Sequence, residues 1–164
     1  MRYLKGNEEI CAVRSFKKAA EIALNSCCLR SKCGCIIVNH GKIAGIGWNS
    51  PPGNRRIKKC FKEDLPKDFI SDKTCCIHAE DRAIRDALIK NPKELMGSRL
   101  YFIRLDKNNQ ITKAGKPYCT WCSKTALDVG IKEFVLWHEK GICVYDTEEY
   151  NKLSFQHRIK SEDR

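Results

Sequence analysis

The first strong pattern in the chain is a stripe of apolar side chains between Glu8 and Cys27. Charged residues such as Arg14 and Lys17 lie between the apolar ones. The apolar positions recur at spacings of three and four residues, and they are Ile10, Val13, Phe16, Ala20, Ala23, Leu24 and Cys27. Because that spacing places them on one face of a helix, the pattern predicts an amphipathic helix over residues 8–27.

Two short apolar runs follow and predict a β-hairpin. They span residues 35–38 and 43–48 and flank Asn39-His40-Gly41, which contains residues that tight hairpin turns favour. The segment Ser50-Pro51-Pro52-Gly53 cannot continue a central strand, since proline has no amide hydrogen to donate. We therefore expect the chain to leave the sheet there and to run as a basic, irregular segment to about residue 74.

Helices and strands alternate in the second half of the chain. The sequence predicts helices over 78–90 and 119–129, strands over 100–105 and 134–137, and a polar loop over 106–116. A short helix and a polar tail are expected after Asp146. This alternation favours an α/β three-layer sandwich, and the opening hairpin makes its central sheet mixed rather than purely parallel.

Length and composition set the broad class. At 164 residues, with 42% apolar and 31% charged residues, the chain suits one globular domain over 1–164 with a core at about 8–150 and a tail at 151–164. No apolar run approaches the roughly 18 to 20 residues of a membrane span. Glu8 and Glu9 stand where an export signal needs apolar residues. We expect a cytoplasmic protein with no membrane partner.

Charge and cysteine content suggest what the domain binds. The net charge is +11, with its densest cluster at residues 55–59, which suits phosphate-bearing partners or a basic surface kept for solubility. The 11 cysteines are odd in number and include adjacent pairs such as Cys27-Cys28, which make a poor disulfide framework. Metal binding is the favoured use for some of the thiols.

Two motifs carry the candidate chemistry, His78-Ala79-Glu80 and Cys119-Thr120-Trp121-Cys122. Two cysteines three positions apart at the start of a helix lie on one face, so both sulfurs can reach one ion. Free amides at a helix N-terminus also favour the thiolate, which is the form that binds metal. With a neutral histidine nitrogen added, two sulfurs and one nitrogen suit Zn²⁺ best.

The number of ligands separates a structural zinc from a catalytic one. A structural ion is closed by four protein ligands, whereas His78, Cys119 and Cys122 are three and leave a position for water. Glu80 is the carboxylate placed to take up and pass on a proton of that water. Residues two apart diverge on a regular helix, so we expect His78 in an irregular first turn. Either motif alone is commonly accidental, but the two together favour the site.

These motifs resemble the signature of the zinc nucleobase deaminases, His-x-Glu followed by Pro-Cys-x-x-Cys. Over most of residues 10–137 the chain is similar to the cytidine and deoxycytidylate deaminase family. Residues 26–53 resemble the opening of the deoxycytidylate deaminases, with the sequence SCCLRSKCGCIIVNHGKIAGIGWNSPPG. Residues 77–84 resemble the first zinc helix, and residues 100–136 the strand, second zinc helix and following strand.

The resemblance implies a cytidine deaminase-like fold and a reaction. In it His78, Cys119 and Cys122 would hold zinc, and Glu80 would shuttle the proton. Zinc hydroxide would attack C4 of a cytosine-containing nucleotide, and dCMP, giving dUMP, is the first substrate to consider. The enzymes that the chain resembles form hexamers, so a homo-oligomer is expected.

Substrate contacts follow from the same resemblance. The Ala79 backbone would meet the pyrimidine, and Asn49, after Gly47-Trp48, would contact the sugar or phosphate side. The basic first third supplies candidates for a phosphate-binding wall, which are Arg30, Lys32 and the cluster at residues 55–59.

Three features depart from the family or exceed it. Tyr118 stands between Pro117 and Cys119, where the family has proline directly before cysteine. The loop over 106–116 is more polar and basic than a compact nucleotide pocket requires. Some phage-type members hold a second, structural zinc in stretches that correspond to Cys28, Cys60 and Cys75 here, and the alternative is that these are small buried apolar residues.

Two other functions are compatible with the sequence. The same chemistry would suit a base within tRNA or single-stranded DNA, because the domain is basic and Trp48, Trp121 and Tyr118 lie near the expected site. A non-catalytic, zinc-stabilised nucleotide-binding module is the third hypothesis.

Overall fold

The computed structural model describes residues 1–66 and 75–159. The end of the predicted basic segment and the last five residues of the predicted tail therefore lie outside the described residues. The α-helices are α1 Gly6–Ala23, α2 Ala79–Lys90, α3 Thr120–Asp128 and α4 Thr147–Ile159. Short 3-10 turns are η1 Pro52–Asn54, η2 Phe61–Asp64 and η3 Pro92–Glu94. No helix within the described ranges is long and apolar enough to cross a bilayer.

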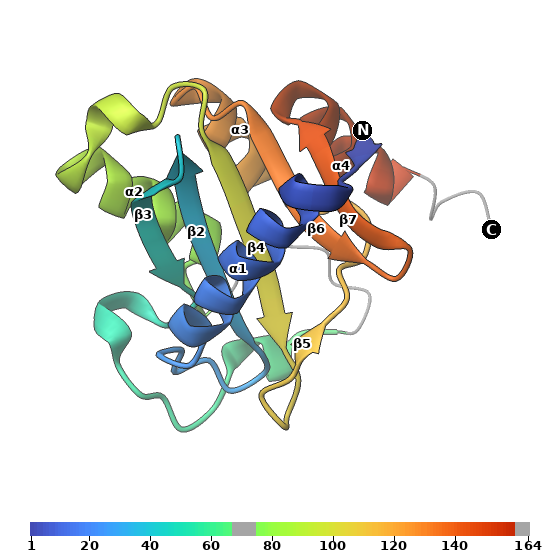
Figure 1. Ribbon diagram of the computed structural model, residues 1–164. Helices are drawn as coiled ribbons and strands as arrows, with labels where there is room; N and C mark the ends of the chain where they lie inside the picture. The colour runs from blue at the N-terminus through green and yellow to red at the C-terminus, as the bar shows by residue number, and fades with distance from the viewer. Residues whose placement is uncertain (67–74, 160–164) are drawn as a thin grey trace.

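One mixed sheet forms the middle of the molecule (Figure 1). Its strands are β1 Arg2–Tyr3, β2 Lys32–Asn39, β3 Lys42–Trp48, β4 Arg99–Leu105, β5 Ile111–Thr112, β6 Glu133–His138 and β7 Gly141–Asp146. They run in the order β1-β7-β6-β4-β2-β3, and β5 pairs with β4 beside this path. The pair β4 and β6 is parallel, and α3 lies between them in the sequence, while the other described pairs are antiparallel. The predicted hairpin and mixed sheet are confirmed.

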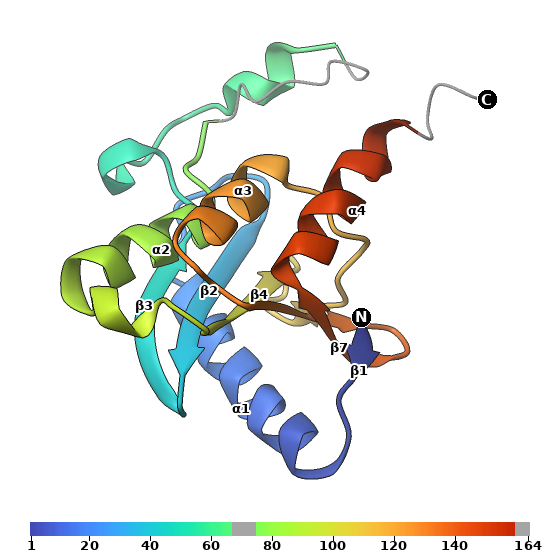
Figure 2. The same cartoon turned by 90° about the horizontal axis from the view of Figure 1, so that it is seen from above.

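Alternating side chains give the sheet two buried faces. Ile36, Tyr101 and Val135 pack with α1, whereas their neighbours Cys35, Leu100 and Phe134 pack with α2 and the elements after it. Seen from above, α1 covers one face, and α2, α3 and α4 cover the other (Figure 2). The predicted three-layer α/β sandwich is therefore confirmed.

Glycines let two helices lie directly on the sheet. A Cβ at Gly47 would clash with backbone atoms of Ala79 and Ala83 in α2, and one at Gly34 would clash with the Ala19 carbonyl of α1. Only a residue without a side chain permits so close an approach. The positions of α1 and α2 are thus set by backbone contact with β2 and β3.

This close approach explains where the prediction for the first helix was wrong. The buried stripe of α1 consists of Ala12, Phe16, Ala19 and Ala23. Ile10 and Leu24, which were assigned to the stripe, are about half exposed. Small alanines face the glycine-bearing strand because bulkier side chains would hold the helix away. The helix also ends at Ala23 rather than at residue 27.

The sequence prediction missed three strands, β1, β5 and β7, and made one helix too short. β1 has two residues, and β7 forms a hairpin with β6, in which Phe134 lies opposite Tyr145. The helix expected to be short after Asp146 is α4, which extends to Ile159 and so includes most of the predicted tail. The partner of β1 is β7, far away in the sequence, so local patterning does not reveal that pair.

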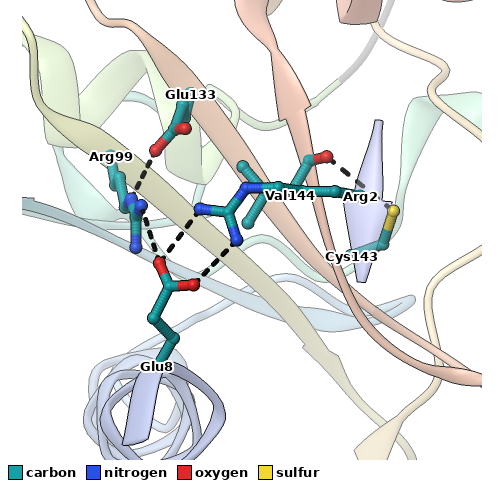
Figure 3. Close-up of polar contacts among 6 residues, drawn as sticks. All are labelled: Arg2, Glu8, Arg99, Glu133, Cys143 and Val144. Atoms are coloured by element: carbon teal, nitrogen blue, oxygen red, sulfur yellow. Dashed lines mark hydrogen bonds and ion pairs between the residues drawn. The ribbon is translucent and has the colours of Figure 1, made fainter. Parts of the chain in front are cut away.

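An ion network ties the N-terminus to the sheet (Figure 3). Glu8 of α1 accepts two hydrogen bonds from the Arg2 guanidinium, at 2.8 and 3.0 Å, and lies 3.3 Å from Nη2 of Arg99. Arg99 of β4 in turn donates to Glu133 of β6. The hydrogen bond from Arg2 is the main cause that lowers the pKa of Glu8 to about 2.

We predict that Gly47→Ala lowers the free energy of unfolding by roughly 1–3 kcal/mol, because the added methyl group pushes α2 off β3. Urea unfolding measures the loss. Gly115→Ala is the matched control, since a Cβ there meets no atom within 4 Å. Equal unfolding midpoints for the two variants would contradict the backbone contact.

We also predict a small, salt-sensitive loss of stability for Glu8→Gln. The folded pKa lies below the ordinary 4.5, so the network stabilises above that pH and loses its effect as pH falls toward about 2. The Glu8 side chain is 47% exposed, which limits the effect to under about 1 kcal/mol. The Tm difference from wild type should shrink in about 1 M NaCl. A Glu9→Gln control with the same Tm loss would count against the network.

Candidate metal centre and adjoining cavity

The predicted metal ligands come together at two helix N-termini. His78 is the N-cap residue of α2, and Cys119 is the N-cap residue of α3. Cys122 lies in the first turn of α3, and its backbone N–H donates to the Cys119 sulfur at 3.3 Å. Both cysteines therefore lie where unpaired amides and the helix dipole favour a thiolate.

The three ligand atoms form one cluster. Nδ1 of His78 lies 3.3 Å from each sulfur, and the two sulfurs are 2.9 Å apart. Among the described residues this is the one group of three or more potential ligands whose atoms all lie within 4.8 Å of one another. A tetrahedral zinc with Zn–S of ~2.3 Å and Zn–N of ~2.0 Å needs ligand atoms about 3.5–3.8 Å apart, so a small expansion fits the ion.

Hydrogen bonds within the cluster shift the pKa values of all three ligands. A hydrogen bond with Cys119 raises the pKa of His78 to about 9. The hydrogen bond between the two thiols lowers the pKa of Cys119 and raises that of Cys122. Metal binding needs both thiolates and a neutral imidazole, so an ion at this cluster displaces protons.

Glu80 lies beside the three ligands and is buried, with 6% of its surface exposed. Burial raises the pKa of its carboxyl to about 7, while the charge of His78 acts in the opposite direction. A hydrogen bond links its carboxylate to Cys122. A carboxyl with a pKa near neutrality can both accept and donate a proton.

The backbone removes the difficulty of the His-x-Glu spacing. His78 has φ −69° and ψ 151°, which is extended, and the helix begins only at Ala79. The backbone of the preceding Ile77 pairs with Ser50, at 3.0 Å from the Ile77 nitrogen to the Ser50 oxygen. This bridge fixes the approach of the chain to α2, so His78 and Glu80 both reach the cluster although they are two residues apart.

A cavity of about 400 Å³ adjoins the cluster. Its lining includes His78, Glu80 and Cys119, together with Ala79 and Asn49, so five of the six predicted site residues border it. The sixth, Cys122, is fully buried behind them. Apolar walls come from β4, β6 and β2, and their residues are Phe102, Ile103, Leu136, Trp137 and Cys33.

Both the oxygen and the nitrogen of the Asn49 side-chain amide form hydrogen bonds within the protein. Its Oδ1 accepts from the Ser26 hydroxyl at 2.8 Å and from the Cys33 backbone at 2.7 Å. Its Nδ2 donates to the Ser31 carbonyl at 2.9 Å, and a further hydrogen bond joins the side chain to Cys28. Asn49 therefore braces the turn after α1 against β2. A contact between Asn49 and a substrate stays a prediction.

The cations at the cavity differ from those expected. Arg30, Lys32 and the cluster at 55–59 are absent from its described lining, and their contact with a phosphate stays a prediction. The cations that line it are Arg104, Lys113 and Lys116. Arg104 belongs to β4. Lys113 and Lys116 belong to the segment after β5, within the loop over 106–116 that is more polar and basic than a compact nucleotide pocket requires.

Aromatic residues were also only partly located from the sequence. Tyr118 lines the cavity, whereas Trp48 and Trp121 do not belong to its described lining. Pro117 is buried, and Tyr118 is the exposed extra residue before Cys119. No role was predicted for Tyr150 of α4, yet this buried residue lines the cavity and hydrogen-bonds to the Tyr118 backbone. No local motif marks Tyr150.

The remaining predicted thiols form two neighbouring pairs. The sulfurs of Cys60 and Cys75 are 3.3 Å apart, and Cys28 hydrogen-bonds to Cys76. The second zinc site proposed for Cys28, Cys60 and Cys75 stays a prediction.

Comparison with known proteins identifies relatives of this site. The family model "Cytidine and deoxycytidylate deaminase zinc-binding region" matches residues 10–138. Deoxycytidylate deaminase from Saccharomyces cerevisiae is 33% identical over 78 residues, which cover 44% of this chain and 24% of the relative. The Schizosaccharomyces pombe deoxycytidylate deaminase is 27% identical over 124 residues, covering 71% of this chain and 34% of the relative. The chain thus matches about a third or less of each relative's length.

One solved structure shares the fold. Cytidine deaminase from Burkholderia pseudomallei has a TM-score of 0.56 at 16% identity, covering 84% of this chain and 94% of that chain. The dCMP deaminase from the cyanophage S-TIM5 in apo form has a TM-score of 0.49 at 24% identity, covering 79% and 82%.

We predict that Cys119→Ala removes one equivalent of zinc per chain, because two remaining ligands cannot hold the ion. Metal analysis after dialysis measures the content. Cys11→Ala, which removes an exposed thiol of α1, should retain the wild-type content. If Cys119→Ala also retains it, the ion is not held at this cluster.

Proposed function

Since the chain belongs to the cytidine and deoxycytidylate deaminase family, we propose that it catalyses the zinc-dependent hydrolytic deamination of a cytosine-containing nucleotide, with dCMP to dUMP as the preferred reaction. The observation that carries this proposal is the position of the buried Glu80 carboxyl beside the three-ligand cluster, at the edge of a cavity. A structural zinc would need a fourth protein ligand and no cavity.

The roles of the metal ligands follow from their donor atoms. His78 would bind zinc through Nδ1, and Cys119 and Cys122 through their sulfurs. Zinc held in this way acts as a Lewis acid that makes water nucleophilic near neutral pH. The open side of the cluster faces the cavity, because His78 and Cys119 line it.

Glu80 performs the proton transfers. It accepts a proton from the water that attacks C4 of the pyrimidine and delivers a proton to the amino group, which leaves as ammonia. The balance is water plus the cytosine compound giving the uracil compound plus ammonia. Burial keeps Glu80 from sharing its proton with bulk water and sets its pKa near 7, where both directions of transfer are accessible.

The remaining lining positions the base. Ala79 is the first residue of α2, so its backbone N–H has no partner within the helix and can be directed to the pyrimidine. Phe102 and Trp137 would exclude water from the ring. Asn49 would act by fixing the wall formed by Ser31 and Cys33. Assembly into a homo-oligomer belongs to the same proposal.

We predict that the zinc-loaded protein releases ammonia from dCMP and that Glu80→Gln lowers the rate by about 10²–10⁴-fold with zinc content unchanged. Glu139→Gln, in the exposed turn between β6 and β7, is the matched control and should keep the wild-type rate. A wild-type rate in Glu80→Gln would remove Glu80 from the mechanism.

The same assay decides among the functions. Cytosine and adenine nucleosides, nucleotides, tRNA and short single-stranded DNA are compared in parallel. Turnover confined to polynucleotides, with affinity falling steeply as salt rises, would replace the nucleotide proposal by a nucleic-acid deaminase. Zinc binding without turnover of any of these substrates would point to a non-catalytic nucleotide-binding module.

A further inference from the structure

Three cations are among the residues that line the cavity. Arg104 lies near the end of β4, and Lys113 and Lys116 belong to the segment that follows β5. Glu80 is the one acidic residue in the described lining. We call Arg104, Lys113 and Lys116 the cationic rim.

Backbone contacts fix the rim to two strands. β5 pairs with β4 so that Thr112 lies opposite Arg104, and the Thr112 hydroxyl donates to the Arg104 carbonyl at 3.0 Å. The Ala114 backbone N–H donates to the Trp137 carbonyl of β6 at 2.7 Å. β5 can be followed beside the end of β4 in Figure 1. The segment that carries Lys113 is therefore held at both β4 and β6.

The side chains of the rim are directed by further contacts. Nζ of Lys113 lies 3.7 Å from the ring centroid of Trp137, which also lines the cavity. The Arg104 Nε donates to the Thr112 hydroxyl at 3.4 Å. Most donors of the Arg104 guanidinium are thus left for a ligand.

The rim carries uncompensated charge. None of its three cations takes part in an ion pair within residues 1–66 and 75–156. Other surface cations do, for example Lys59 with Asp64 and Lys90 with Asp86. Three cations without ion pairs on one hairpin and the segment that follows it attract an anion with more than one acceptor oxygen, and a guanidinium matches phosphate in geometry.

We propose that the cationic rim binds the phosphate monoester of the nucleotide whose base is placed at Glu80. This inference rests on the proposed function and names its substrate class. Arg104 and Lys116 contact the phosphate oxygens, and Lys113, held on Trp137, adds charge beside them. A cavity of about 400 Å³ is in the range of a site for one small ligand, which favours a mononucleotide over a polynucleotide strand.

The test compares ligands that differ only in the phosphate. Binding of dUMP and of deoxyuridine to the zinc-loaded protein is measured by calorimetry, and turnover of dCMP and deoxycytidine by ammonia release. Arg104→Gln and Lys116→Gln should each weaken dUMP binding about 10- to 100-fold, the value of a charge-assisted hydrogen bond. The preference for dCMP over deoxycytidine should fall by the same factor.

Lys107→Gln is the matched control. Lys107 lies in the turn between β4 and β5 and is exposed, and it is not part of the described lining. The Lys107→Gln variant loses one positive charge near the same hairpin. If long-range attraction alone held the phosphate, this variant would weaken dUMP binding as much as Arg104→Gln or Lys116→Gln. We expect dUMP binding within about twofold of wild type for this variant, because exposed charges are screened.

Three outcomes would contradict the proposal that the cationic rim binds the phosphate monoester. The first is equal weakening of dUMP and deoxyuridine binding, and the second is an equal effect of Lys107→Gln. The third is a loss seen only with oligodeoxycytidylate, which would assign the rim to a phosphodiester backbone. If the proposed function is wrong, no cytosine compound releases ammonia. In that case the binding of dUMP, compared with that of deoxyuridine, still tests whether the cationic rim binds a phosphate.

Discussion

The close approach of α2 to β3 is the constraint on which the site depends. Gly47 lets the helix backbone rest on the strand, so the start of α2 is fixed to the sheet rather than to flexible side chains. The Ser50–Ile77 bridge fixes the chain that enters the helix. His78 is then the last extended residue before a rigid element, and α3 only has to bring Cys119 and Cys122 to the same point.

Several distant segments complete the cavity around that point. α4 contributes Tyr150, and the Ser123 hydroxyl of α3 donates to Oδ1 of Asn151 of α4 at 2.7 Å, which ties the two helices together. The β4–β5 hairpin supplies the cationic rim, and Asn49 braces the opposite wall. In the proposed function these tasks are physically separate: groups at the helix N-termini would handle the metal and the proton, and the cations of the cationic rim would bind the phosphate.

How much the sequence could predict depended on the range of the interaction. The clustering of His78, Cys119 and Cys122 could be predicted because short motifs at helix starts encode these residues locally. The buried face of α1 was misplaced because Gly34, which selects small helix residues, lies 11 residues after Ala23. The candidates for a phosphate wall were taken from the first third of the chain because the excess of basic residues lies there. Arg104 and Lys113 reach the cavity through strand pairing and β6 contacts, and Tyr150 through helix packing, and no spacing rule encodes these.

A crystal structure of the zinc-loaded protein, with the ion located by anomalous scattering, is the most direct measurement. We expect zinc bound by Nδ1 of His78 and the sulfurs of Cys119 and Cys122, with the fourth position open to the cavity next to the Glu80 carboxyl. A fourth protein side chain on that ion, or a Glu80 carboxyl turned away from it, would contradict the catalytic assignment.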